Sequence, residues 1–143
     1  MKEQQAMFET GFTVEWGDCD EAGIVFYPNY FYWLDCTFQR FLRSHGLNQR
    51  ELRKRFGAVT PIIQAHSDFK APIRYDDTLV IRAIVRQESE RRFRVDYHLS
   101  SNGTPVANAH EIRAWALVAA DGSIKGGPID PEFLAICNAS DKP

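Results

Sequence analysis

One long amphipathic helix ahead of a run of extended segments is the feature that most constrains this fold. Over residues 29–45, apolar side chains recur at three- and four-residue steps, the period of a helix with one buried face. From residue 60 onward the period falls to two, which is typical of strands. A helix segregated from consecutive strands predicts an α+β fold with a mainly antiparallel sheet.

The expected sheet has five strands. Phe12, Val14 and Trp16 alternate with polar residues and predict a first strand before the helix. The Asn102-Gly103 step predicts a tight hairpin, because both residues accept positive φ. No repeat or linker divides the chain, so we expect a single domain over residues 1–143. Four further strands are expected over 63–71, 79–85, 93–99 and 105–119, with short helices over 48–56 and 131–137.

Composition limits the classes of partner. The chain has 143 residues, 44% of them hydrophobic, and a net charge of −2, so we expect no broad attraction to nucleic acid or membranes. Residues 1–10 lack the apolar core of a signal peptide, and no run approaches the ~20 apolar residues of a membrane span. Three widely spaced cysteines do not indicate a disulfide framework or zinc site, so a cytoplasmic protein is expected.

An acidic loop precedes the helix. Asp18 and Asp20 lie two residues apart, and Pro28 suits the first helical turn, where a missing N–H costs nothing. Unpaired N–H groups and the helix dipole favour negative charge at that end. A carboxylate beside such an anion site could serve the hydrolysis of an acyl group. The other interpretation is that the two aspartates only shape a turn.

Taken together, these segments resemble the hotdog-fold acyl-CoA thioesterases, in particular the 4-hydroxybenzoyl-CoA thioesterase branch. The similarity is carried by Gly-Asp-Cys-Asp-x-Ala-Gly-Ile-Val-x-Tyr-Pro-Asn-Tyr at 17–30, ahead of Trp33-Leu34-Asp35. It continues through Thr60-Pro61-Ile62, Tyr75-Asp76-Asp77 and Glu111-Ile112-Arg113. The resemblance implies a five-stranded sheet wrapped around one long central helix.

The resemblance also implies catalytic roles. Asp20 matches the family's catalytic carboxylate, which attacks the thioester carbonyl or activates a water molecule. Tyr27 matches the position whose backbone N–H stabilises the developing oxyanion. Asp18 is expected to orient the loop rather than to react.

Binding residues follow from the same resemblance. Thr60, Pro61 and Ile62 match positions that line the ligand site. Asp35 matches a helix carboxylate near the acyl pocket, where it could accept a hydrogen bond from a phenolic hydroxyl or remain a surface residue. The coenzyme A phosphates are expected at a basic turn matched by Ser89, Arg91 and Arg92, which Glu90 interrupts; a merely solvated turn is the alternative. Coenzyme A is part of the substrate, and no other cofactor is expected.

The function expected is hydrolysis of an aryl-CoA thioester to the free acid and coenzyme A. A short-chain aliphatic acyl-CoA thioesterase, a hotdog dehydratase or hydratase, and an acyl-CoA binding protein remain alternatives. His45, His66, His98 and His110 make no metal-ligand spacing, and no metal site is expected. Strand segments that are apolar on both sides predict a homodimer or a homotetramer built as a dimer of dimers.

Overall fold

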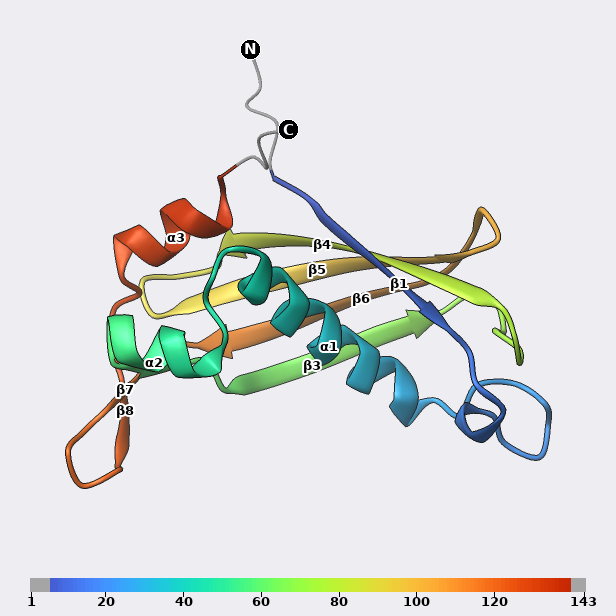
Figure 1. Ribbon diagram of the computed structural model, residues 1–143, viewed down its shortest axis with the longest axis horizontal. Helices are drawn as coiled ribbons and strands as arrows, with labels where there is room; N and C mark the ends of the chain where they lie inside the picture. Colours follow the sequence, from blue (N-terminus) through green and yellow to red (C-terminus); the bar gives the residue numbers. More distant parts are fainter. Residues whose placement is uncertain (1–5, 140–143) are drawn as a thin grey trace, which may run out of the picture.

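The computed structural model describes residues 6–139 and contains the five-stranded antiparallel sheet, in the order β1-β4-β5-β6-β3 (Figure 1). β1 and β3 form the two edges of this sheet. The Asn102-Gly103 hairpin between β5 and β6 is confirmed, with φ of 52° and 81°. The strands are β1 (Phe8–Thr13), β3 (Ile62–Phe69), β4 (Thr78–Gln87), β5 (Arg92–Ser101) and β6 (Thr104–Ala114).

The predicted long helix is α1 (Pro28–Ser44), which lies along one face of the sheet (Figure 1). Pro28 occupies its first turn, and the chain leaves the helix through Gly46 at a φ of 72°. The buried helix face packs on the inward side chains of β5, as the 5.8 Å separation of the Phe38 and Phe93 rings shows. The helix side chains buried in this layer are Tyr30, Trp33, Leu34, Thr37, Phe38, Phe41 and Leu42.

A smaller sheet and two short helices close one end of the molecule. The small sheet has the order β2-β7-β8, with β2 at Ala58–Val59, β7 at Ala116–Val118 and β8 at Ile124–Gly126. The two short helices expected from the sequence are confirmed as α2 (Gln49–Phe56) and α3 (Pro131–Cys137). Trp115 packs against both helices, because the centre of its ring lies 5.7 Å from that of Phe56 in α2 and 4.8 Å from that of Phe133 in α3.

Two expected strands differ from the structure. The first ends at Thr13, and Trp16 lies in a short 3-10 helix (Trp16–Asp18) with 76% of its surface exposed. The reason is local, since the Asp18 side chain accepts a hydrogen bond from the Glu15 N–H and turns the chain away from the sheet. The strand expected over 105–119 is two strands, because the chain breaks at Trp115 and β7 joins the small sheet.

β3 is an edge strand that is exposed along nearly its whole length. Its apolar side chains are open to solvent in the single chain, with Ile62 45%, Ile63 47% and Phe69 47% exposed. An apolar strand edge that nothing covers is a site for pairing with another chain. No helix within residues 6–139 is long and apolar enough to cross a membrane.

Candidate active site

The loop that carries Asp20 is held by backbone hydrogen bonds to both of its flanks. The Asp20 N–H donates to the Ile24 carbonyl at 2.9 Å, and Cys19 and Val25 form an isolated antiparallel bridge. One carboxylate oxygen of Asp20 accepts the Ala22 N–H at 2.9 Å, while the residue is exposed. The carboxylate is therefore oriented by the turn and accessible from solvent.

Asp18 joins this loop to the start of α1. Its carbonyl accepts hydrogen bonds from the Phe26 N–H at 2.9 Å and from the Asn29 side chain at 2.8 Å. Its carboxylate accepts the Glu15 N–H at 2.8 Å. The two contacts of the Asp18 carbonyl tie the loop to the start of α1, whereas the carboxylate contact fixes only the turn before the loop.

The N-terminus of α1 presents a free donor. Tyr27 is the N-cap residue, and within residues 6–139 its N–H donates to no protein group. Pro28 has no N–H, and the Asn29 and Tyr30 N–H groups donate back to the carbonyls of Phe26 and Tyr27. The Tyr27 N–H is thus available to a ligand at the positive end of the helix dipole.

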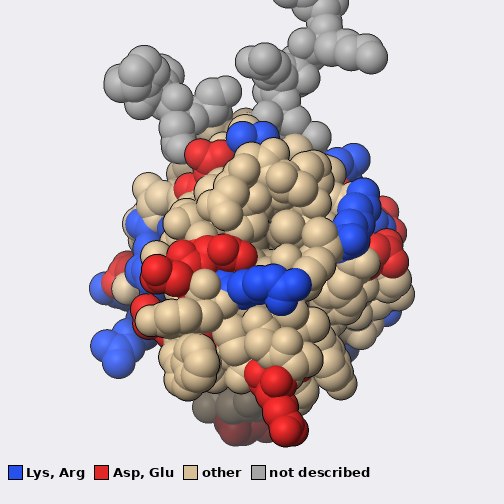
Figure 2. All heavy atoms as spheres, turned by 90° about the vertical axis from the view of Figure 1, so that its right-hand side faces the viewer, with Lys and Arg blue, Asp and Glu red and all other residues tan. Residues whose placement is uncertain are grey.

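Exposed aromatic side chains surround this end of the molecule. Trp16 is 76% exposed and makes an edge contact with Tyr75 at 5.2 Å, while Phe26 is 50% and Tyr27 60% exposed. Figure 2 shows that uncharged residues form most of this end, with a few acidic and basic side chains between them. Ile24, Tyr27, Tyr30 and Phe69 line an apolar cavity of about 410 Å³ here.

Arg113 brings Asp35 and Thr60 together. Arg113 was named from the sequence as part of the family resemblance, but it was assigned no role. The buried Arg113 guanidinium donates to the Asp35 carboxylate at 2.9 Å and to the Thr60 carbonyl at 2.9 Å. Pro61 accepts the Ala114 N–H at 2.9 Å, and Ile62 begins the exposed edge strand. Ile62 also pairs with Arg113 in the β3–β6 ladder, so all four predicted ligand-site residues contact the end of β6.

The Arg113 guanidinium pairs with the buried carboxylate of Glu111. Arg113 contacts Glu111 at 3.1 Å, and the Tyr97 hydroxyl donates to the same Glu111 oxygen at 2.6 Å. Burial raises the pKa of Glu111, and the neighbouring Arg113 opposes that rise. Burial, followed by the Glu111 charge, raises the pKa of Tyr97 well above its ordinary value, so its hydroxyl stays a donor. The alternation of residues along β6 places Glu111 and Arg113 on its buried side. Two opposite charges at such positions are the sequence signal that could have identified this buried pair.

The basic turn lies between β4 and β5. The Ser89 N–H donates to the Arg92 carbonyl at 3.0 Å, and the Trp115 N–H donates to the Arg91 carbonyl at 3.0 Å. Arg91 lines a cavity of about 420 Å³ together with Lys125 of β8. Lys125 was missed from the sequence, because only the fold places β8 beside this turn.

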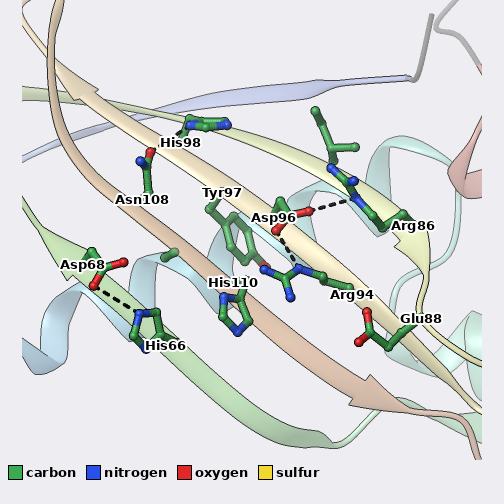
Figure 3. A pocket seen from close by; sticks show the side chains of 12 residues that line it. His66, Asp68, Arg86, Glu88, Arg94, Asp96, Tyr97, His98, Asn108 and His110 are labelled. Carbon is green, nitrogen blue, oxygen red and sulfur yellow. Dashed lines mark hydrogen bonds and ion pairs between the residues drawn. The ribbon is translucent and has the colours of Figure 1, made fainter.

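A second polar cavity, of about 630 Å³, lies on the sheet face opposite α1 (Figure 3). His66 of β3 pairs with Asp68 at 3.2 Å and stacks on His110 of β6 with ring centroids 5.2 Å apart. Asp96 there binds both Arg86 at 2.9 Å and Arg94 at 2.8 Å. None of the predicted site residues lines this cavity.

The predicted site residues form three groups in a single chain. Asp20 and Tyr27 lie at one end of the sheet, and the Ser89–Arg92 turn lies at the other (Figure 1). Asp35 and Thr60 lie toward the end where β3 begins. One chain therefore separates the expected catalytic carboxylate from the expected coenzyme-binding turn.

Comparison with known proteins places this geometry in a family. Residues 14–136 match the model of the Thioesterase-like superfamily. A 4-hydroxybenzoyl-CoA thioesterase of Pseudomonas sp. (strain CBS-3) is 33% identical over 134 residues, covering 87% of this chain and 93% of that protein. A 1,4-dihydroxy-2-naphthoyl-CoA hydrolase of Synechococcus elongatus is 32% identical over 100 residues, covering 69% and 74%.

Solved structures agree with the sequence matches. A mutant 4-hydroxybenzoyl-CoA thioesterase complexed with 4-hydroxybenzoyl-CoA superposes with a TM-score of 0.82 at 28% identity, covering 92% of this chain and 98% of that one. A gentisyl-coenzyme A thioesterase superposes with a TM-score of 0.76 at 34% identity, covering 87% and 98%. The chain therefore belongs to the Thioesterase-like superfamily and is an acyl-CoA thioesterase of the hotdog fold.

Proposed function

We propose that this thioesterase hydrolyses an aryl-CoA thioester, of the 4-hydroxybenzoyl- or benzoyl-CoA type, to the free acid and coenzyme A. The observation that carries the proposal is the exposed Asp20 carboxylate in a loop that leads to the unpaired Tyr27 N–H. The carbonyl oxygen gains negative charge as it is attacked, and an N–H at a helix N-terminus stabilises that charge. Relatives named for aryl-CoA substrates support the acyl class.

Asp20 acts in one of two ways in this proposal. As a nucleophile, its carboxylate attacks the thioester carbon, the C–S bond breaks, and water then hydrolyses the mixed anhydride. As a general base, it accepts a proton from the water molecule that attacks the same carbon. Either route yields the acid and the coenzyme A thiol, and either uses the carboxylate in its ionised form.

Turnover of a thioester panel tests the acyl class. We expect kcat/KM to be highest on benzoyl- and hydroxybenzoyl-CoA and lower on acetyl- and butyryl-CoA. The physical reason is the aromatic and apolar lining beside Tyr27 and Tyr30, which buries more surface of an aryl ring than of a short chain. Preference for the aliphatic thioesters favours the aliphatic alternative, and binding without turnover favours a binding protein.

A dimer paired through β3 is part of the proposal. Two β3 edges related by a two-fold axis pair in antiparallel order, so opposite ends of the two strands meet. The Tyr27 end of one chain, marked by the Tyr30–Phe69 ring contact at 4.8 Å, then lies beside the Thr60 end of its partner. Such pairing covers the exposed Ile63 and Phe69 edge and completes each site from two chains.

Light scattering at micromolar concentration should therefore give the mass of a dimer or a tetramer. Because catalytic and ligand-binding groups come from different chains in this arrangement, dilution to monomer should abolish turnover. A monomer with full activity contradicts the shared site.

The coenzyme A phosphates are proposed to bind at Ser89, Arg91 and Arg92. Replacing both arginines with Ala should raise KM for full CoA thioesters by at least about tenfold, since one charge-assisted hydrogen bond is worth roughly 1.5–3 kcal/mol. A truncated thioester without the nucleotide should be nearly unaffected. The matched control replaces Arg53 and Lys54, two exposed cations of α2, and should change neither KM. An equal response of both substrates excludes nucleotide binding at the turn.

A further inference from the structure

One turn, formed by residues 73–77 ahead of β4, holds both ends of the loop that carries Asp20. At the entry to the loop, the Val14 N–H donates to the Asp77 carbonyl at 2.9 Å, and the Asp76 N–H donates to the Val14 carbonyl at 2.9 Å. These bonds continue the pairing of β1 with β4 past the end of β1 (Figure 1). The turn therefore fixes the point at which the loop leaves the sheet.

The exit of the loop is attached to the same turn. The Val25 N–H donates to the Ile73 carbonyl at 2.8 Å, and Ile24 forms an isolated antiparallel bridge with Arg74. The Ile24 carbonyl also accepts the Asp20 N–H at 2.9 Å. The backbone of Asp20 is therefore linked to the turn through one intervening segment.

The side chain of Asp77 closes this turn. Its Oδ2 accepts the Arg74 N–H at 2.9 Å, beside the backbone bond from the Asp77 N–H to the Arg74 carbonyl at 3.1 Å. Asp76, between them, has a φ of 71°, a left-handed conformation that aspartate tolerates better than most residues do. Within residues 6–139 the Asp77 carboxylate accepts from no other group, so its one hydrogen bond lies within the turn.

We infer that Asp77 is a positioning residue whose carboxylate fixes the 73–77 turn and thereby sets the place of the Asp20 carboxylate relative to the Tyr27 N–H. This inference rests on the proposed catalytic role of Asp20. Asp77 acts through backbone segments only, because it makes no hydrogen bond with Asp20 or Tyr27 within residues 6–139. A misplacement of about 1 Å between reacting groups can lower a rate about a hundredfold, so even a small shift of the loop is measurable.

Asp77→Ala removes the acceptor of the Arg74 N–H and should lower kcat about 10- to 100-fold on the best thioester of the panel. KM should stay within about threefold, because the lost placement matters only in the transition state. Asp77→Asn keeps an oxygen that accepts the same N–H and should retain at least about half of the wild-type kcat. Asp77→Ser offers a shorter acceptor of the kind found in turns, and its kcat should lie between those of the other two variants.

A double-variant cycle shows whether Asp77 acts through Asp20. The rates are measured in single turnovers with enzyme in excess over the thioester, so that slow variants can be compared. In an Asp20→Asn background, Asp77→Ala should change the rate less than about twofold, because no carboxylate is left to place. A purely structural role of Asp77 predicts a similar fold loss in both backgrounds.

Amide hydrogen exchange reports on the attachment of the loop. Asp77→Ala should speed exchange of the Val25 N–H, which donates to Ile73 of the turn, and of the Asp20 N–H. The centre of β5 exchanges only through larger openings and should be unaffected. Unchanged exchange of the Val25 N–H contradicts the attachment of the loop through Asp77.

The matched control is Asp121→Ala in the turn between β7 and β8. Asp121 Oδ1 accepts the Ser123 N–H at 3.0 Å, so this variant also removes a carboxylate–backbone hydrogen bond from a turn. The β7–β8 hairpin lies at the other end of the molecule from the Asp20 loop (Figure 1). Asp121→Ala should leave kcat and the exchange of residues 20–25 unchanged.

The outcomes for Asp77 and for the proposed function are distinct. An enzyme that hydrolyses no thioester of the panel overturns the proposed function, and an Asp20→Asn variant with the wild-type rate overturns the catalytic role of Asp20. If Asp20→Asn is slow but folded Asp77→Ala keeps the wild-type kcat, Asp77 does not position Asp20 and the proposed function stands. Equal losses in Asp77→Ala and Asp77→Asn, or a further fall in the Asp20→Asn background, also overturn the role of Asp77. If Asp77→Ala does not fold, Asp77→Ser takes its place, and a wild-type kcat in that variant has the same meaning.

Discussion

Replacing Asp20 with Asn should lower kcat on aryl-CoA thioesters by about 10²–10⁴-fold, the contribution expected of a general base. Asn keeps the size of the side chain and an oxygen that can accept the Ala22 N–H, so the turn should survive. What it loses is the charge, and with it both the nucleophile and the base. If Asp20 forms a covalent intermediate, the loss should reach the upper end of this range or exceed it.

The measurement is kcat and ligand affinity on benzoyl- and 4-hydroxybenzoyl-CoA. Affinity should persist, because the Tyr27 N–H and the apolar cavity beside it are unchanged. Asp18→Asn is the matched control two residues away. It alters a carboxylate that accepts the Glu15 N–H, and it should reduce stability or rate only modestly. If Asp20→Asn retains more than about a tenth of the wild-type rate, far above the expectation for a lost base, Asp20 is not the catalytic carboxylate.

Arg113→Met should lower the free energy of unfolding by about 3–5 kcal/mol, the cost of leaving a buried charge without its partner. The charge left behind is Glu111, which is 1% exposed and would retain only the Tyr97 hydroxyl among the side-chain donors seen here. Adding Glu111→Gln removes that charge, so the double variant should recover most of the loss.

Denaturant titration at one fixed protein concentration gives these differences, because association of chains shifts apparent stability by mass action. The control is Arg94→Met on the outer face of the same sheet. Arg94 is 32% exposed and pairs with Asp96, so its loss should cost about 1 kcal/mol or less. If Arg113→Met and Arg94→Met lower the free energy of unfolding equally, the loss of Arg113 does not leave a costly buried charge at Glu111.

Helices and strands were predicted well from local sequence where the spacing of apolar residues or a short turn motif determines them. The period of apolar residues predicted α1 to within one residue at each end, and Asn102-Gly103 predicted the hairpin. The period of apolar residues gave the wrong strand ends at Trp16 and Trp115. At both residues the direction of the chain is set by hydrogen bonds and strand pairing that the period does not report. The Asp18 side chain turns the first segment, and pairing with β2 and β8 draws β7 away from the large sheet.

The sequence by itself determined the fold class, the family and the loop that presents Asp20 before a helix, since these depend on neighbouring residues and on a matched motif. Only the tertiary structure decided that Arg113 lies between Asp35 and Thr60, 78 and 53 residues away in sequence, and that Lys125 lies beside Arg91. Such contacts depend on how strands from distant parts of the chain pair. The register of that pairing is fixed by the packing of the whole core rather than by local sequence.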